Sequence, residues 1–236
     1  MSLDPAADAL PLTTRALLLD MDGTLIDSGP TVERAWDSLL AELGSTETFG
    51  PAMHGVPARV VLTHLFPEMD EQEIAAAHAR IEQIEIEDVD EIVTMPGTAR
   101  ILEQLDDAAQ QLGRATWTIV TSCTRPLFEA RWGTTGLPAP EALVTADQVP
   151  RGKPDPDPYL LGAERLGVAP ADAVVIEDSA GGLRSGAAAG CTTIAVTSTT
   201  PAADLRPLTG ALVTSLDDLE VTVREDALLI SRRGQA

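Results

Sequence analysis

The sequence is poor in positive charge. Among its 236 residues, Lys and Arg together supply 16 side chains against 37 from Asp and Glu, so the formal net charge is −21. Proteins that bind nucleic acid without sequence preference neutralise many backbone phosphates with basic side chains. A chain this acidic offers no such surface, and we expect no nucleic acid partner.

Cysteine and long apolar runs are scarce as well. Cys123 and Cys191 are the two cysteines, too few for the disulfide framework of a small secreted domain. The N-terminal residues lack the basic and apolar regions of a signal peptide. No apolar stretch approaches the roughly 20 residues that a membrane-spanning helix needs. We therefore expect a soluble cytoplasmic protein without membrane contact, and we favour a monomer.

Lysine is nearly absent from the sequence, and most basic residues are arginine. Fifteen of the 16 basic residues are Arg, and the remaining one is Lys153. The two cations are not interchangeable, because an ammonium is a compact point charge and a guanidinium is a planar fork. A single retained lysine is either a chance survivor or a group with a task, and its neighbours decide between these readings.

Short apolar runs that end in polar residues recur along the chain, as is typical of buried parallel strands. We expect strands at Ala16–Leu19, Thr116–Val120, Ala142–Thr145, Ala173–Ile176 and Thr193–Val196. Helical patterns lie between them, at residues 102–112, 160–166 and 181–189. This alternation predicts an α/β fold with a Rossmann-like, mostly parallel sheet flanked by helices. Beyond Ala211 the pattern weakens, and residues 221–223 and 228–230 predict short edge strands.

Residues 28–95 contain no strand candidate. Apolar side chains follow helical spacing from Val32 to Leu43 and again from Ile74 to Ile84. We therefore expect a small α-helical domain inserted at residues 28–95, with the sheet domain built from residues 1–27 and 96–236. In this arrangement Trp36 is interpreted as part of the helical core.

Two carboxylates follow the first expected strand in the segment from Asp20 to Leu25, which reads Asp-Met-Asp-Gly-Thr-Leu. At the carboxyl edge of a sheet, one of Asp20 and Asp22 can attack phosphorus while the other handles protons. Gly23 then lets backbone amides turn around the acids. The alternative interpretation is an Asp-Gly turn with solvated acids.

Three further elements end at the same predicted edge. Thr121 and Ser122 offer a hydroxyl and turn amides to phosphate oxygens. Lys153 lies between Gly152 and a proline-rich run that fixes the path of the chain. Glu177 and Asp178 add carboxylates, and the combined oxygen-rich site is of the kind that Mg²⁺ prefers. A divalent cation would also offset repulsion between these acids and a phosphate ester.

These four elements, in this order, resemble the haloacid dehalogenase-like superfamily of phosphohydrolases. The resemblance implies that Asp20 forms an aspartyl-phosphate and that Asp22 is the general acid and base, with its main-chain carbonyl on the metal. It also implies that Thr121 and the amide of Ser122 hold the phosphoryl group.

In the same family, the positions of Lys153, Asp178 and Glu177 have defined tasks. Lys153 would steady the nucleophile and the phosphate, and Asp178, helped by Glu177, would complete the Mg²⁺ site together with Asp20 and Asp22. The helical insert resembles the cap that closes over the active site and selects the substrate.

One loop of the insert resembles the specificity loop of sugar- and polyol-phosphate phosphatases. It runs from Met53 to Arg59 and contains His54 and Gly55. We expect His54, Gly55 and Arg59 to contact the substrate; equally, Arg59 is compatible with a surface position and His54 with a hydrogen-bonded loop position. The other histidines, His64 and His78, are interpreted as structural.

The expected activity is Mg²⁺-dependent hydrolysis of a small sugar or polyol phosphate. A mutase of the β-phosphoglucomutase type keeps all four elements and stays an alternative, as does a phosphoglycolate phosphatase. The dehalogenase branch lacks the second acid, which Asp22 supplies here. The phosphonate-cleaving branch needs a lysine from the cap, and residues 28–95 contain none. A non-enzymatic binding module would need neither both acids nor the one lysine.

Overall fold

A parallel sheet of five strands lies at the centre of the computed structural model, which describes residues 9–50, 53 and 56–234. The strand order is β5-β2-β6-β7-β8. The strands span β2 (Ala16–Leu19), β5 (Trp117–Ile119), β6 (Ala173–Glu177), β7 (Thr192–Val196) and β8 (Ala211–Val213). Helices flank this sheet, so the predicted α/β fold is confirmed. The helices are α4 (Thr98–Leu112), α5 (Arg125–Gly133), α6 (Asp157–Arg165), α7 (Ala180–Ala189) and α8 (Ala202–Leu205), with single 3₁₀ turns at Ala146–Gln148, Pro170–Asp172, Arg206–Leu208 and Leu216–Asp218.

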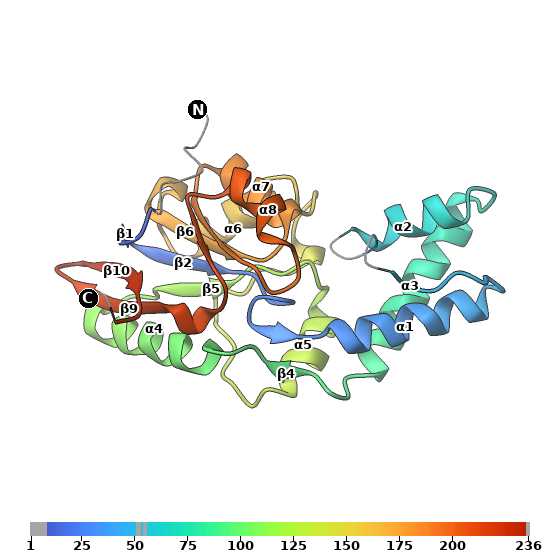
Figure 1. Ribbon diagram of the computed structural model, residues 1–236, viewed down its shortest axis with the longest axis horizontal. Helices are drawn as coiled ribbons and strands as arrows, with labels where there is room; N and C mark the ends of the chain where they lie inside the picture. The colour runs from blue at the N-terminus through green and yellow to red at the C-terminus, as the bar shows by residue number, and fades with distance from the viewer. Residues whose placement is uncertain (1–8, 51–52, 54–55, 235–236) are drawn as a thin grey trace.

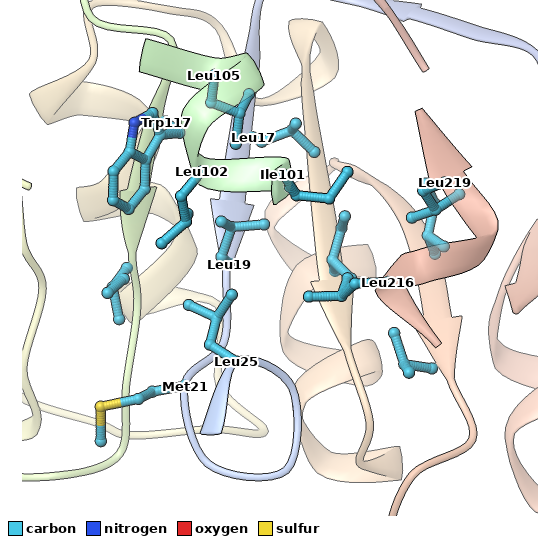
Figure 2. Close-up of a cluster of buried hydrophobic side chains, with 14 of the residues drawn as sticks. Leu17, Leu19, Met21, Leu25, Ile101, Leu102, Leu105, Trp117, Leu216 and Leu219 are labelled. Atoms are coloured by element: carbon cyan, nitrogen blue, oxygen red, sulfur yellow. The ribbon is translucent and has the colours of Figure 1, made fainter. Parts of the chain in front are cut away.

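Strand β2 is apolar throughout because both faces of the sheet are covered. Its alternating side chains enter two different clusters: Leu17 and Leu19 pack with Ile101 and Leu105 of α4 (Figure 2), whereas Leu18 packs with Tyr159 of α6. All four β2 residues are fully buried. Fully burying one such leucine contributes about 1.5–3 kcal/mol, so β2 is held firmly and its carboxyl end is a fixed point for the acids that follow.

The expected strand at Ala142–Thr145 is reduced to an isolated bridge. Val144 pairs with Val120 in parallel register, and its N–H donates to the carbonyl of Ile119 at 2.9 Å. The pairing stops there because Thr145 already caps the 3₁₀ turn Ala146–Gln148 that follows. That prediction was therefore wrong in extent, although it placed the segment correctly beside β5.

A second, antiparallel sheet has the order β1-β10-β9. It consists of β1 (Leu12–Thr14), β9 (Leu219–Arg224) and β10 (Ala227–Arg232). The expected short edge strands at residues 221–223 and 228–230 are thus a hairpin of two six-residue strands in a sheet of their own, and they do not extend the central sheet. Leu228 and Ile230 are fully buried against the main apolar cluster, which explains their position.

Three helices lie to one side of the central sheet, α1 (Gly29–Glu42), α2 (Ala58–Leu65) and α3 (Glu71–Glu87) (Figure 1). They share an apolar cluster separate from that of the sheet. Trp36 is 4% exposed within this cluster and stacks on Phe49 with ring centroids 5.6 Å apart. Helix α3 begins with a capping box: the side chain of Asp70 accepts from the backbone N–H of Glu73, and the side chain of Glu73 accepts from the backbone N–H of Asp70.

The chain crosses between sheet and helices through a two-stranded ribbon. Strand β3 (Ile26–Asp27) pairs antiparallel with β4 (Val93–Thr94), so β4 is a short strand within the segment that was expected to contain none. Near this ribbon, Arg34 of α1 pairs with two acids of the segment between α3 and β4: Asp88 at 2.9 Å and Glu91 at 2.6 Å. Among the described residues, no helix has the length and apolar character to cross a membrane.

Candidate active site

The expected chemical groups meet at the carboxyl ends of three neighbouring strands. Asp20 directly follows β2, Glu177 ends β6, and Thr121 follows β5 by two residues. Because β2 lies between β5 and β6 in the sheet, these groups converge although they are far apart in sequence. Lys153 reaches the same point from the loop before α6, so the structure brings together all four sequence elements.

Lys153 is the cation at the centre of the site. Its Nζ lies 2.5 Å from Asp20 Oδ1 and 2.7 Å from Glu177 Oε1, and it donates to the carbonyl of Val120 at 2.9 Å. The side chain is 7% exposed. Burial lowers the pKa of Lys153, but Asp20 and Glu177 outweigh that effect and hold the pKa well above its usual value. The ammonium is therefore held in place and charged.

Glu177 connects Lys153 to the start of α7. One oxygen accepts from Lys153 and from the Tyr159 hydroxyl at 3.0 Å. The other accepts from the N–H of Asp178 and from both the N–H and hydroxyl of Ser179, at 2.9–3.1 Å. Gly182 makes this approach possible, because a Cβ at that position would lie 1.6 Å from Glu177 Oε1.

Asp178 is buried beside Gly23 at the turn after β2. Its oxygens accept from Thr24 at 3.1 Å and from Thr199. Burial raises the pKa of Asp178 to about 7, with a further increase from Glu177 and opposition from the two threonine hydrogen bonds. Gly23 has φ +83°, and a Cβ there would lie 2.3 Å from Asp178 Oδ2, so only glycine permits the turn to pass this close.

Three carboxylates form a possible metal site. One oxygen each from Asp20, Glu177 and Asp178 lies within 4.8 Å of the others. Burial, and then the charge of Glu177, raise the pKa of Asp20 well above its usual range, although Lys153 opposes the shift. Three buried acids thus face one ammonium. The acidic groups outnumber the ammonium, and all of the donors are oxygen atoms. Both features fit a hard divalent cation.

Asp22 points to a different set of partners. Its Oδ1 accepts from the hydroxyl of Ser28 at 2.6 Å and pairs with Arg131 Nη1 at 2.7 Å, and its Oδ2 lies 3.2 Å from the Cys123 thiol. Its side chain is 27% exposed, whereas that of Arg131 is 5% exposed. The two acids of the motif therefore have separate environments, and only Asp20 touches the lysine.

Sequence reasoning missed Arg131 and its second partner, Glu85 of α3. The Arg131 Nη2 lies 3.3 Å from Glu85 Oε1. A signal was present, since Leu127, Phe128 and Arg131 are spaced for one helix face and all three are buried in α5. An arginine at an apolar position of a helix marks a buried cation that needs acidic partners.

The other residues predicted to contact the phosphate or the substrate range from buried to exposed. Thr121 is 2% exposed and its hydroxyl accepts from the N–H of Cys123 at 3.0 Å, while Ser122 is exposed. Arg59, 49% exposed, lies 3.5 Å from Glu71 at the start of α3, so its partner belongs to the helical segment. His54 and Gly55 fall outside the described residues.

Helix α3 also contacts the core side of the site. Glu82 accepts from the hydroxyl of Thr124, the residue that precedes α5. Together with Glu85 and Arg131, this contact ties α3 to α5 immediately beside Asp22. His78 is half-buried on the same helix, and His64 is exposed on α2.

Comparison with known proteins agrees with this geometry. The model of the haloacid dehalogenase-like hydrolase family matches residues 14–190, and the chain belongs to that family, as the resemblance implied. Hexitol phosphatase A of Escherichia coli is 45% identical over 183 residues, which cover 77% of this chain and 82% of that protein. The 2-deoxyglucose-6-phosphate phosphatase 1 of Saccharomyces cerevisiae is 31% identical over 196 residues, covering 77% and 79%.

Among solved structures, CbbY from Rhodobacter sphaeroides in complex with phosphate is similar to this chain with a TM-score of 0.70 and 26% identity. The match covers 86% of this chain and 95% of that one.

Proposed function

We propose that this protein is a Mg²⁺-dependent phosphatase that hydrolyses a small sugar or polyol phosphate monoester, a hexitol phosphate in the first place. The observation that carries the proposal is the buried bridge in which Lys153 holds Asp20 and Glu177 together at the sheet edge. The similarity to hexitol phosphatase A, at 45% identity, supports the substrate class.

Asp20 is the proposed nucleophile. A carboxylate oxygen of Asp20 attacks phosphorus, the bond from phosphorus to the ester oxygen breaks, and the sugar or polyol leaves. Lys153 lies 2.5 Å from Asp20 Oδ1, so it favours the ionised form that attack requires. Its charge also offsets the negative charge that gathers on the phosphoryl oxygens in the transition state.

Asp22 is the proposed general acid and base. Its proton passes to the departing alkoxide, and the resulting carboxylate then takes a proton from water, whose oxygen attacks the phosphorus of the aspartyl-phosphate. Inorganic phosphate leaves, Asp20 is regenerated, and Asp22 again holds a proton. Thr121 and the exposed Ser122 turn, next to Asp20 at the sheet edge, supply hydroxyl and amide donors for the phosphoryl oxygens.

Asp20 and Asp178, with Glu177 close behind them and the main-chain carbonyl of Asp22, would hold the magnesium ion. When bound, a divalent cation supplies Lewis-acid charge neutralisation for a phosphate ester. We further propose that residues 28–95 act as the cap that covers this site, with His54, Gly55 and Arg59 in its specificity loop. The cytoplasmic location, the monomeric state and the absence of nucleic acid partners stay predictions.

The test is phosphate release from a panel of hexitol, hexose, glycerol, glycolate and nucleotide phosphates, with Mg²⁺ and with a chelator. We expect release concentrated on hexitol and sugar phosphates, lost with the chelator and in Asp20→Asn. Asp226→Asn is the matched control, because Asp226 is 86% exposed and remote from the site. Preference for phosphoglycolate would contradict the substrate class. No phosphate, but isomerised hexose phosphate, would replace the hydrolase with a mutase.

A further inference from the structure

The guanidinium of Arg131, on α5, contacts Asp22, the second acid of the motif. It lies on the core helix that begins just after the Thr121-Ser122 turn, and it pairs with Asp22 at 2.7 Å and with Glu85 of α3 at 3.3 Å. A single cation thus joins the proposed general acid and base to a helix of the inserted segment. From the start of the inserted segment, the hydroxyl of Ser28 also donates to Asp22, at 2.6 Å.

The buried position of Arg131 has a cost in stability. Its side chain is 5% exposed, and its Nε has no hydrogen-bond partner among the described residues. Leaving a buried N–H unsatisfied costs about 1–3 kcal/mol. Buried charge pairs can often be replaced by apolar side chains without loss of stability. An arginine kept here at that cost therefore has a use that an apolar residue cannot serve.

The geometry around Asp22 shows what that use is. Ser28 and Arg131 both contact Oδ1, and the Cys123 thiol lies at Oδ2. Ser28 precedes α1, whereas Cys123 and Arg131 come from the α5 side. Hydroxyl and thiol hydrogens rotate about a single bond, but the guanidinium is a planar fork whose direction is set by both of its partners. Arg131 is thus the contact of Asp22 that also has an acidic partner in α3, Glu85.

We propose that Arg131 is a positioning residue for Asp22, and that Glu85 holds Arg131 in place when α3 lies against α5. The inference rests on the proposed phosphatase function, because it assigns a task in the proton transfer by Asp22. It concerns orientation: without Arg131, Asp22 keeps its carboxyl group but presents it to the leaving oxygen less often. Transfer of a proton to the leaving group is the step that suffers.

Leaving groups that differ in their need for a proton separate this task from general damage. An alkyl phosphate such as sorbitol 6-phosphate releases an alkoxide that must be protonated, whereas p-nitrophenyl phosphate releases a stable anion. The kcat/KM value reports loss of transition-state stabilisation from free enzyme and substrate. The ratio of kcat/KM on the alkyl ester to that on the aryl ester is therefore the readout.

We expect Arg131→Gln to lower this ratio by about 10- to 100-fold, a part of the roughly 10²–10⁴-fold that general acid catalysis typically contributes, because Asp22 itself is retained. Arg131→Lys should recover part of the ratio, since an ammonium can hold Asp22 but cannot reach both acids. Arg80→Gln is the matched control, because Arg80 pairs with Glu42 at 2.7 Å on the exposed side of the helices; it should leave the ratio unchanged.

Glu85→Gln tests the link to α3. We expect a smaller fall in the ratio, and no further fall when Glu85→Gln is added to Arg131→Gln, because residues that act through one another are not additive. If Arg131→Gln does not fold, Glu85→Gln alone decides, and an unchanged ratio there overturns the proposal. Equal losses on both esters, or a Lys variant no better than the Gln variant, also overturn it. If the unaltered enzyme hydrolyses neither ester, the proposed function itself fails.

Discussion

The Glu177 carboxylate occupies the space that a side chain at Gly182 would need, with Oε1 only 1.6 Å from the position of a Cβ there. Helix α7 can therefore begin close enough to Glu177 for the Ser179 N–H and hydroxyl to donate to it. The same carboxylate holds Lys153 at 2.7 Å. A glycine in a helix thus determines whether Lys153 has its second acid.

Gly182→Ala should displace Glu177 and damage both stability and activity. We expect a loss of about 1–3 kcal/mol in the free energy of unfolding, the usual cost of overpacking a filled site, together with a strong fall in kcat. Gly181→Ala is the matched control, since nothing lies within 4 Å of a Cβ there. It should gain up to about 1 kcal/mol from helix propensity. Urea unfolding and phosphate release measure both effects, and equal behaviour of the two variants would contradict this account.

Local sequence patterns predicted the position of the candidate site residues better than they predicted the strands at the edges of the fold. Strands such as β2 and β6 are continuous apolar runs because both of their faces are covered, and the acids after them stand at a position that the parallel topology fixes. The meeting of Asp20, Lys153 and Asp178 at one edge of the sheet could therefore be predicted from local patterns. The antiparallel sheet of β1, β9 and β10 was less visible, because its pairing joins the two ends of the described chain.

The contacts between the helical segment and the core could not be predicted. Arg131 and Glu85 are 46 residues apart in the sequence, and neither belongs to a motif. Their pairing depends on how α3 lies on α5, which no spacing within one helix reveals. For the same reason, Glu82 and its contact with Thr124 were not foreseen.

Asp178→Asn should abolish the response of the protein to magnesium. In the wild type, Mg²⁺ at about 100 times its dissociation constant should raise the free energy of unfolding by about 2.7 kcal/mol. Asn offers no charge to the cation, so we expect this increase to vanish. Without metal, the variant should be as stable as the wild type or more so, because burial opposes ionisation of Asp178 and raises its pKa to about 7.

Thermal unfolding with and without Mg²⁺ measures this response, with calcium as a second cation and Asp226→Asn as the exposed control. A variant that retains the full shift in Tm would show that the ion binds without Asp178. Loss of the shift in the control as well would point to a non-specific effect of salt on this acidic chain.

Ionisation of Glu85 should lower the free energy of unfolding as pH rises through the weakly acidic range. Burial raises the pKa of Glu85 from 4.5 to about 6, although Arg131 opposes the shift. Between these values the folded state holds more protons than the unfolded state, so the free energy of unfolding falls with increasing pH. The shift corresponds to at most about 2 kcal/mol at 1.36 kcal/mol per pKa unit.

Glu85→Gln removes this titration and supplies the reference. The free energy of unfolding of the wild type minus that of Glu85→Gln should decrease from about pH 4 to pH 7 and then level off. Denaturant unfolding in the presence of a chelator measures it at each pH. A difference that stays constant would mean that the ion pair with Arg131 balances burial, and one that grows with pH would mean that it outweighs burial.

Lys153→Met should be costly to the fold as well as to catalysis. The substitution keeps an apolar stem but leaves Asp20 and Glu177 facing each other in a site where Lys153 itself is 7% exposed. Removing one partner of a buried pair typically costs about 3–5 kcal/mol, and we expect a loss of that order near neutral pH, with turnover abolished. Arg151→Met, two residues away, is the control: Arg151 is 61% exposed where it pairs with Asp157, and exposed pairs contribute about 0–1 kcal/mol.

Since the cost arises from two unpaired carboxylates, lowering the pH should reduce the loss in Lys153→Met as those groups take up protons. A deficit that persists unchanged in acid would instead assign the stabilising role of Lys153 to packing against Tyr159, whose ring centroid lies 5.0 Å from its Nζ.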